Sequence, residues 1–183
     1  MGSLARPQKQ TQSWQIEPAT DADWPGIWRI FHETVQTSDT YAYAPDTTEE
    51  DAKHIWIGKG TYGTGAQAFV VRDGAEIVGT FTLRPNHNGL GGHVANAGYM
   101  VRADQRGRGI ARAMCRFSLE EAARRGFHSM QFNYVVSTNT AAVNLWQAMG
   151  FQIIGIAPKS FKHGAFGYVD IYIMHRFLEE NRP

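Results

Sequence analysis

The chain has 183 residues, of which 43% are hydrophobic and 19% are charged. This length and composition favour one globular domain whose core needs neither a disulfide nor a metal. A formal net charge of +1 argues against general nucleic-acid binding. No stretch approaches the ~18 apolar residues of a membrane span. The single cysteine and the absence of an apolar leader predict a protein of the reducing cytoplasm.

The N-terminal third is predicted to hold a strand and two helices. Residues 1–13 are polar and are expected to form a flexible segment ahead of a single domain at 14–183. Alternating polarity predicts a strand at 14–17. An amphipathic helix should begin at Thr20, and a second helix should begin at the capping sequence around Thr48.

The rest of the chain alternates between strand and helix patterns. Strands are predicted at 68–72, 76–83, 93–101, 129–136, 151–156 and 168–177, and helices at 109–125 and 140–149. The strand–helix–strand unit over 93–136 implies one parallel pair of strands inside an otherwise antiparallel sheet. We therefore predict an α/β fold with a mixed, twisted sheet of about seven strands and about four helices.

A segment rich in glycine and arginine lies where the predicted strand 93–101 leads into the helix 109–125. It consists of Arg106, Gly107, Arg108, Gly109, Ile110 and Ala111. Glycine lets the backbone approach a ligand closely, and the free N–H groups and positive dipole end of a helix start attract phosphate. The segment is neither a Walker loop nor the six-residue dinucleotide fingerprint. We predict a phosphate-binding loop here; the alternative is an ordinary turn before a surface helix.

Two stretches in the right order resemble the GCN5-related N-acetyltransferase (GNAT) family. The segment 106–111 is similar to the family's Arg/Gln-x-x-Gly-x-Gly/Ala motif. Later positions are similar to its Asn-x-x-Ala-x-x-Leu-Tyr-x-x-x-Gly-Phe run, namely Asn139, Ala142, Leu145, Gly150 and Phe151. The resemblance covers about residues 14–177.

This resemblance implies acetyl-CoA as the cofactor. Its pyrophosphate would lie on the amides of residues 106–111. Its pantetheine arm would pair with the strand end formed by Tyr99, Met100 and Val101, and Asn139 would contact the cofactor beyond that strand.

A narrower resemblance concerns the substrate. Residues 83–86, 93–98, 132–133 and 168–170 look like a subgroup that includes yeast acetyltransferases acting on proline analogues such as azetidine-2-carboxylate. In that subgroup two asparagines handle the substrate, and their positions map onto Asn96 and Asn133. An amide oxygen can accept an amine N–H and hold the amine for attack. The alternative for each asparagine is a buried amide that neighbouring backbone satisfies.

Proton transfer is less well defined by the sequence. The amine must lose a proton, because a simple alkyl ammonium has a pKa of about 10.4. His93 is a candidate base and substrate contact, with a structural hydrogen bond as the alternative. The family's usual proton donor is a tyrosine, but this chain has Trp146 there, whose indole has no titratable proton for the task. Tyr99 and Tyr134 are candidate substitutes, or the thiolate leaves without a dedicated acid.

Other parts of the predicted site are assigned by position. Trp146 is still expected beside the cofactor, and Tyr41, in the loop 37–45, is expected as a wall of the amine pocket unless that loop is only a packed connector. Alternation along 129–136 places Asn133 on a face with Gln131 and Val135, opposite Phe132, Tyr134 and Val136. Cys115 occupies a packing position, and no histidine pair has metal-binding spacing, so we expect neither a protein nucleophile nor a metal.

The predicted function is acetyl-CoA-dependent N-acetylation of a small amine or amino acid, with a proline analogue as the narrower hypothesis, by direct transfer in a ternary complex. The alternatives are a catalytically silent acyl-CoA-binding regulator and an acetyltransferase of peptide or protein amines. We expect a small-molecule partner and neither nucleic acid nor membrane. The resemblance also allows a homodimer formed through the terminal strands.

Overall fold

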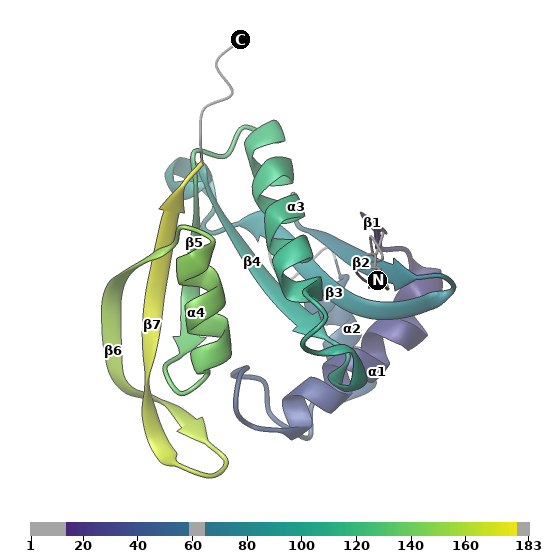
Figure 1. The fold of residues 1–183 in the computed structure, drawn as a ribbon, viewed down its shortest axis with the longest axis horizontal. Coiled ribbons are helices and arrows are strands. Elements are labelled where there is room, and N and C mark those ends of the chain that lie inside the picture. Colours follow the sequence, from purple (N-terminus) through teal and green to yellow (C-terminus); the bar gives the residue numbers. More distant parts are fainter. Residues whose placement is uncertain (1–13, 59–64, 179–183) are drawn as a thin grey trace, which may run out of the picture.

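The computed structural model describes residues 14–58 and 65–178, and Figure 1 shows their arrangement. The prediction made for residues 1–13 lies outside these described ranges. No helix within them is long and apolar enough to cross a membrane.

One mixed sheet of seven strands forms the centre of the described fold, as the sequence predicts. The structure shows their spatial order to be β1-β2-β3-β4-β5-β7-β6. The strands are β1 (Gln15–Pro18), β2 (Gln67–Asp73), β3 (Glu76–Pro85), β4 (Val94–Val101), β5 (Ser129–Val136), β6 (Gln152–His163) and β7 (Gly167–Phe177). Among the described strands only β4 and β5 run parallel, and every other neighbouring pair is antiparallel.

Four α-helices cover the two faces of the sheet. They are α1 (Trp24–Gln36), α2 (Glu49–Trp56), α3 (Ile110–Arg124) and α4 (Thr140–Ala148). Alternate residues of β2 separate the two layers, because Phe69 and Val71 pack in the cluster that contains α3 whereas Ala68 and Val70 pack with α1 and α2. Helix α4 covers β5 and β7 on the side of α3, as Figure 1 shows.

Two predicted boundaries are wrong. The first helix begins at Trp24 rather than at Thr20, because Asp21–Asp23 form a 3-10 turn under a capping box made by Thr20 and Asp23. Strand β6 extends to His163 instead of ending at 156. Its pairing with β7 is interrupted between Ala157 and Phe161, where the positive φ of Lys159 breaks the regular pattern that identifies a strand.

The central parallel pair is short. Strands β4 and β5 pair at only two positions, Val94 with Ser129 and Ala95 with Met130. Beyond these positions the strands part toward their carboxyl ends, and the main-chain groups along both inner edges must find partners other than each other. The candidate site lies where these two strands separate.

A bulge in β5 breaks the predicted alternation beyond Asn133. Pairing with β7 joins Phe132 to Met174 and then Val135 to Tyr172, so β5 has one extra residue in this stretch. Val135 consequently packs in the same cluster as Phe132, Val136 packs in a different cluster, and Tyr134 is 42% exposed. The expected grouping of Val135 with Asn133, and of Tyr134 with Phe132, is therefore wrong.

Asp23 ties the start of α1 to β2. Its carboxylate accepts the Thr20 N–H at 2.8 Å and the Thr20 hydroxyl at 2.9 Å, and it pairs with Arg72. Burial opposes ionisation of this side chain, but the bonds from Thr20 and the Arg72 charge outweigh that effect and hold the pKa of Asp23 below its ordinary value.

We predict that Asp23→Asn lowers the free energy of unfolding at neutral pH by about 1–2 kcal/mol. The folded pKa lies below the unfolded value of about 3.9. The wild-type contribution is therefore complete above that value and is lost as the pH falls through the folded pKa. Urea unfolding at several pH values should show the gap between wild type and variant closing in acid; a constant gap would contradict this role.

Candidate functional site

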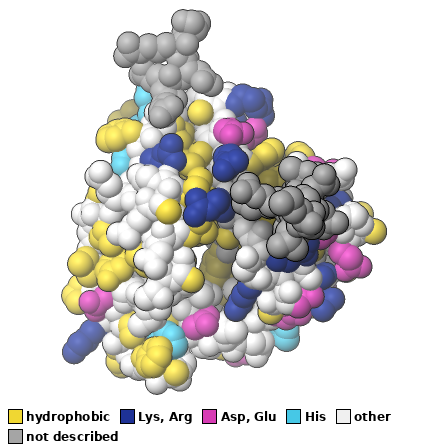
Figure 2. Space-filling model, in the orientation of Figure 1, with side chains coloured by type: hydrophobic (Ala, Val, Ile, Leu, Met, Phe, Trp, Pro, Cys, Tyr) yellow, Lys and Arg dark blue, Asp and Glu magenta, His cyan; other side chains and the backbone are white. Residues whose placement is uncertain are grey.

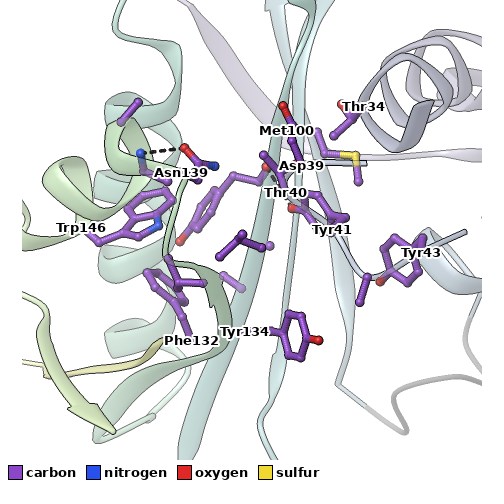
Figure 3. Close-up of a pocket in the computed structure, with 18 of the residues that line it drawn as sticks. Thr34, Asp39, Thr40, Tyr41, Tyr43, Met100, Phe132, Tyr134, Asn139 and Trp146 are labelled. Carbon is purple, nitrogen blue, oxygen red and sulfur yellow. Dashed lines mark hydrogen bonds between the residues drawn. The ribbon is translucent and has the colours of Figure 1, made fainter. Parts of the chain in front are cut away.

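A cavity of about 860 Å³ opens where β4 and β5 part. This volume lies in the range of small-molecule sites. Figure 3 shows side chains from the loop after α1, from β4 and β5, and from α4 converging on it. The sequence-predicted residues that line it are Tyr41, Asn96, Tyr99, Met100, Val101, Arg106, Asn133, Asn139 and Trp146.

The edge of β4 that faces the cavity presents main-chain groups. The Arg102 N–H bonds to the Val78 carbonyl at 3.0 Å, so by alternation Tyr99 and Val101 turn their N–H and C=O groups toward the parting. The Tyr41 hydroxyl donates to the Tyr99 carbonyl at 2.9 Å. A Cβ on Gly98 would come within 3.2 Å of that hydroxyl, so glycine at 98 permits the approach.

The glycine-rich segment leads directly into α3. Gly107 and Gly109 have φ values of +76° and +88°, which glycine adopts readily, and Gly109 is the N-cap. The first main-chain bond of the helix runs from the Ala113 N–H to the Gly109 carbonyl at 3.0 Å. The N–H groups of Ile110 and Ala111 therefore have no intrahelical acceptor and form the positive end of the helix.

The arginines near this segment differ in their partners. Arg106 lines the cavity, whereas Arg108 pairs with Asp73 at 2.8 Å across the β2–β3 turn, so Arg108 offers the loop mainly its main chain. Arg102 pairs with Glu76 at 2.9 Å and with Asp104 at 2.7 Å. Figure 2 shows several basic side chains along the hollow between the two halves of the molecule, on the face that carries α3 and α4.

Asn96 bridges the parting strands. Its side chain is 7% exposed, and its Nδ2 donates to the Gln131 carbonyl at 2.7 Å. The Asn96 side chain thus adds one hydrogen bond between β4 and β5 just beyond their last main-chain pair, Ala95 with Met130. This bond fixes the orientation of the amide, and Oδ1 has no hydrogen-bond partner among the described residues.

Asn133 belongs to a chain of amides that the sequence did not reveal. Gln131 Nε2 donates to Asn133 Oδ1 at 2.8 Å, and Asn133 Nδ2 donates to Asn86 Oδ1 at 2.6 Å. Asn86 is held at the end of β3 by its main-chain bond to Val94, at 2.7 Å. Polar residues alternate along the second half of β3 and just beyond its end, at Thr80, Thr82, Arg84 and Asn86, and this was the signal that could have identified it.

Two further predicted contacts come from α4. Asn139 is the N-cap of this helix, and its Oδ1 accepts the Ala142 N–H at 3.1 Å. Trp146 packs between Tyr99 and Phe132, with ring centroids 5.0 and 5.1 Å away. Figure 3 shows both residues on the same wall of the cavity.

The two tyrosines considered as proton donors are engaged elsewhere. The Tyr99 hydroxyl lies 2.6 Å from Ser118 Oγ on α3, and burial raises the pKa of Tyr99 well above its ordinary value. The Tyr134 hydroxyl donates to the Ser160 carbonyl.

His93 is not among the residues that line the cavity. Its ring contacts the Leu90 carbonyl at 3.1 Å and packs edge-on against His128, which matches the structural alternative. The charged lining residues are Asp39, Arg84 and Arg106. Within the described ranges no group of three or more histidine, cysteine or acidic side chains is arranged to hold a metal.

Comparison with known proteins identifies relatives across the chain. The family description "Acetyltransferase (GNAT) family" matches residues 24–151. A GCN5-related N-acetyltransferase structure from Kribbella flavida shares 44% sequence identity, covers 90% of this chain and 98% of its own, and superposes with a TM-score of 0.84.

Two curated relatives have names that state an activity. The L-methionine sulfoximine/L-methionine sulfone acetyltransferase of Pseudomonas aeruginosa is 31% identical over 93% of this chain and 98% of its own length. The N-acetyltransferase aca1 of Schizosaccharomyces pombe is 37% identical over 53% of this chain, and the match spans about half of that relative, 47%. The extent of the family match and its agreement with the fold show that the chain belongs to the acetyltransferase (GNAT) family.

Proposed function

We propose that the protein is an acetyl-CoA-dependent N-acetyltransferase that acts on a small amine or amino acid by direct transfer in a ternary complex. The observation that carries this proposal is the cavity that extends from Arg106, which leads into the glycine-rich segment before α3, past Tyr99 and Val101 of β4, to the amide cluster where β4 and β5 part. The groups that would bind phosphate lie toward one end of this cavity, and the groups that would orient the amine lie at the other.

The residues present suit a pyrophosphate and an extended amide-containing arm. The amides of residues 107–111 and the Arg106 side chain would hold the phosphates. The main chain of Val101 would pair with the arm as another strand would, and Asn139 and Trp146 would line its far side. Bound acetyl-CoA would supply the thioester carbonyl that the amine attacks.

The acceptor would lie against the amide cluster. Asn96 Oδ1, fixed by the bond of its Nδ2 to Gln131, would accept an amine N–H. Arg84 lines the cavity and pairs with Asn96 in the β3–β4 register, so its positive charge would favour a carboxylate beside the amine. This arrangement supports an amino acid as acceptor. A proline analogue is the narrower proposal and an L-methionine sulfoximine-like acceptor its competitor, by similarity to the Pseudomonas relative.

Proton movements would depend on few groups. Asp39 is the one carboxylate among the described lining residues, and His163 lines the same cavity, so these two side chains would be the candidates for taking a proton from the ammonium. Since Tyr99 and Tyr134 are engaged elsewhere and the Trp146 indole does not titrate, the thiolate would leave without a dedicated protein acid.

A second candidate function is a silent acyl-CoA-binding regulator. The observation that favours it is Trp146, which stands where the family's usual tyrosine donor would be. The two functions differ in turnover: a regulator binds the thioester but releases no thiol when amines are added.

Our first prediction for this function concerns the loop before α3. Wild type should bind acetyl-CoA and release free thiol with at least one amino acid in an amine panel. Gly107→Ala should weaken acetyl-CoA binding roughly tenfold, because alanine strains the left-handed backbone that aims the amides. Titration calorimetry and a thiol assay measure the two effects.

The matched control is Gly126→Ala at the other end of α3. Gly126 also has a positive φ, +83°, and open space around its Cβ position, so this variant has a similar backbone cost without touching the loop. Equal affinities of the two variants for acetyl-CoA, or no binding by wild type, would refute the phosphate-binding assignment.

Asn133→Ala should lower kcat/KM for the acceptor by about tenfold or more while the KM for acetyl-CoA stays within about twofold. The reason is that the amide chain positions the acceptor, not the cofactor. The double variant with Asn86→Ala should be no worse than Asn133→Ala alone, because Asn86 would act through Asn133. Additive losses in this double-mutant cycle would show that the two asparagines act independently.

The Cys115 thiol should be inert. Cys115 is fully buried, and burial raises its pKa to about 12, so little thiolate exists at neutral pH. Native protein should resist iodoacetamide at pH 8, and Cys115→Ala should keep its turnover rate. An acetyl group trapped on Cys115 during turnover, detected by mass spectrometry, would replace direct transfer with a covalent mechanism.

A further inference from the structure

The tryptophan that precedes β1 stands beside the glycine-rich segment. Trp14 packs against the core cluster that contains residues of α3. A Cβ built on Gly109 would lie 3.7 Å from Trp14 Cη2, and apart from the chain neighbours of Gly109 no other described residue comes within 4 Å of that position. The far edge of the indole therefore lies beside the N-cap residue of α3.

No hydrogen bond between described residues fixes this indole. Trp14 Nε1 is buried and has no partner among the residues that the structure describes. A buried donor without a partner lowers stability, so the ring keeps its place through packing. A phenylalanine at 14 would fill most of the same space without an unpaired N–H, but its shorter ring would not reach Gly109.

The same edge of the sheet contacts the segment at a second point. Strand β1 pairs with β2, and Asp73, the last residue of β2, pairs with Arg108 at 2.8 Å. Arg108 and Gly109 are thus each met by a side chain from this edge. Gly107, by contrast, has no described atom within 4 Å of its Cβ position, so the contacts concentrate where α3 begins.

A left-handed glycine does not fix its own conformation. Gly109 has a φ of +88°, and glycine populates positive and negative φ about equally well. Because Gly109 immediately precedes Ile110 and Ala111, its conformation decides where their N–H groups point. A neighbour that restricts Gly109 before a ligand arrives removes part of the ordering cost from binding.

We propose that Trp14 is a positioning residue of the cofactor site, because its indole holds Gly109 in the conformation that aims the amides at the start of α3 toward a pyrophosphate. The inference rests on the proposed acetyl-CoA-dependent function and adds to it a residue that does not line the cavity. Trp14 would touch neither the thioester nor the amine and would act through Gly109.

The test uses Trp14→Phe, which keeps an aromatic ring in the core but withdraws its far edge from Gly109. Its free energy of unfolding should stay close to that of wild type, while the Kd for acetyl-CoA in titration calorimetry should rise about tenfold. With saturating acetyl-CoA, kcat and the KM for the acceptor should stay within about twofold of wild type. A residue that only filled the core would not separate cofactor affinity from stability and kcat in this way.

The matched control is Trp28→Phe on α1. Trp28 is also half-buried, and it stacks on Trp24 with ring centroids 6.2 Å apart, in the core on the other face of the sheet. This variant should keep the wild-type affinity for acetyl-CoA. Equal losses of affinity in the two variants, an unchanged affinity in folded Trp14→Phe, or a Trp14→Phe chain that does not fold would each overturn the proposal.

Hydrogen exchange tests the same role without the cofactor. The Ala113 N–H bonds to the Gly109 carbonyl at 3.0 Å, and at the other end of α3 the Phe127 N–H bonds to the Ala122 carbonyl at 3.0 Å. In Trp14→Phe the Ala113 amide should exchange about tenfold faster than in wild type, and the Phe127 amide should keep its rate. An unchanged Ala113 rate, or equal acceleration of both amides, would contradict the positioning of Gly109. If wild type binds no acetyl-CoA, the proposed function fails, and the exchange of Ala113 still decides what Trp14 does.

Discussion

The separation of β4 from β5 after two residue pairs is the constraint on which the candidate site depends. A central strand pair that stops early leaves N–H and C=O groups inside the molecule, and each such group costs about 1–3 kcal/mol if it stays unpaired. The protein satisfies two of them with side chains, the Gln131 carbonyl through Asn96 and the Tyr99 carbonyl through Tyr41. The remaining edge, near Val101, is where an extended ligand can complete the sheet.

The same separation explains why residues far apart in sequence serve one site. The two faces of the sheet have their own cores, one with α1 and α2 and one with α3 and α4, and these hold the strands that form the walls in place. Between them a polar strip is built from neutral amides, which can orient an amine without imposing a charge. Arg84 and Asp39 add one charge of each sign, a combination that suits a zwitterionic molecule better than a simple amine.

The sequence predicted the elements well where periodicity and caps agree, and less well where local geometry breaks the period. The succession of strands and helices along the chain and the loop before α3 followed from alternation, from the glycines and from the change of period at Gly109. The bulge beside Asn133 and the irregular part of β6 around Lys159 leave no periodic signal, so the faces and the strand end were wrong there. The partners of Asn133 and Asn96 depend on segments joined only by folding, which a single sequence does not show, whereas the family resemblance supplied the residues themselves.

The bulge in β5 shifts the alternation of inward and outward side chains by one residue within the strand. Upstream of it, even-numbered side chains such as Met130 and Phe132 enter the core shared with α3, while downstream the odd-numbered Val135 does so. Removing a single residue at this point would restore strict alternation. Phe132 and Val135 would then be two positions apart and would keep their common face, so the extra residue alters only the stretch between them, which holds Asn133.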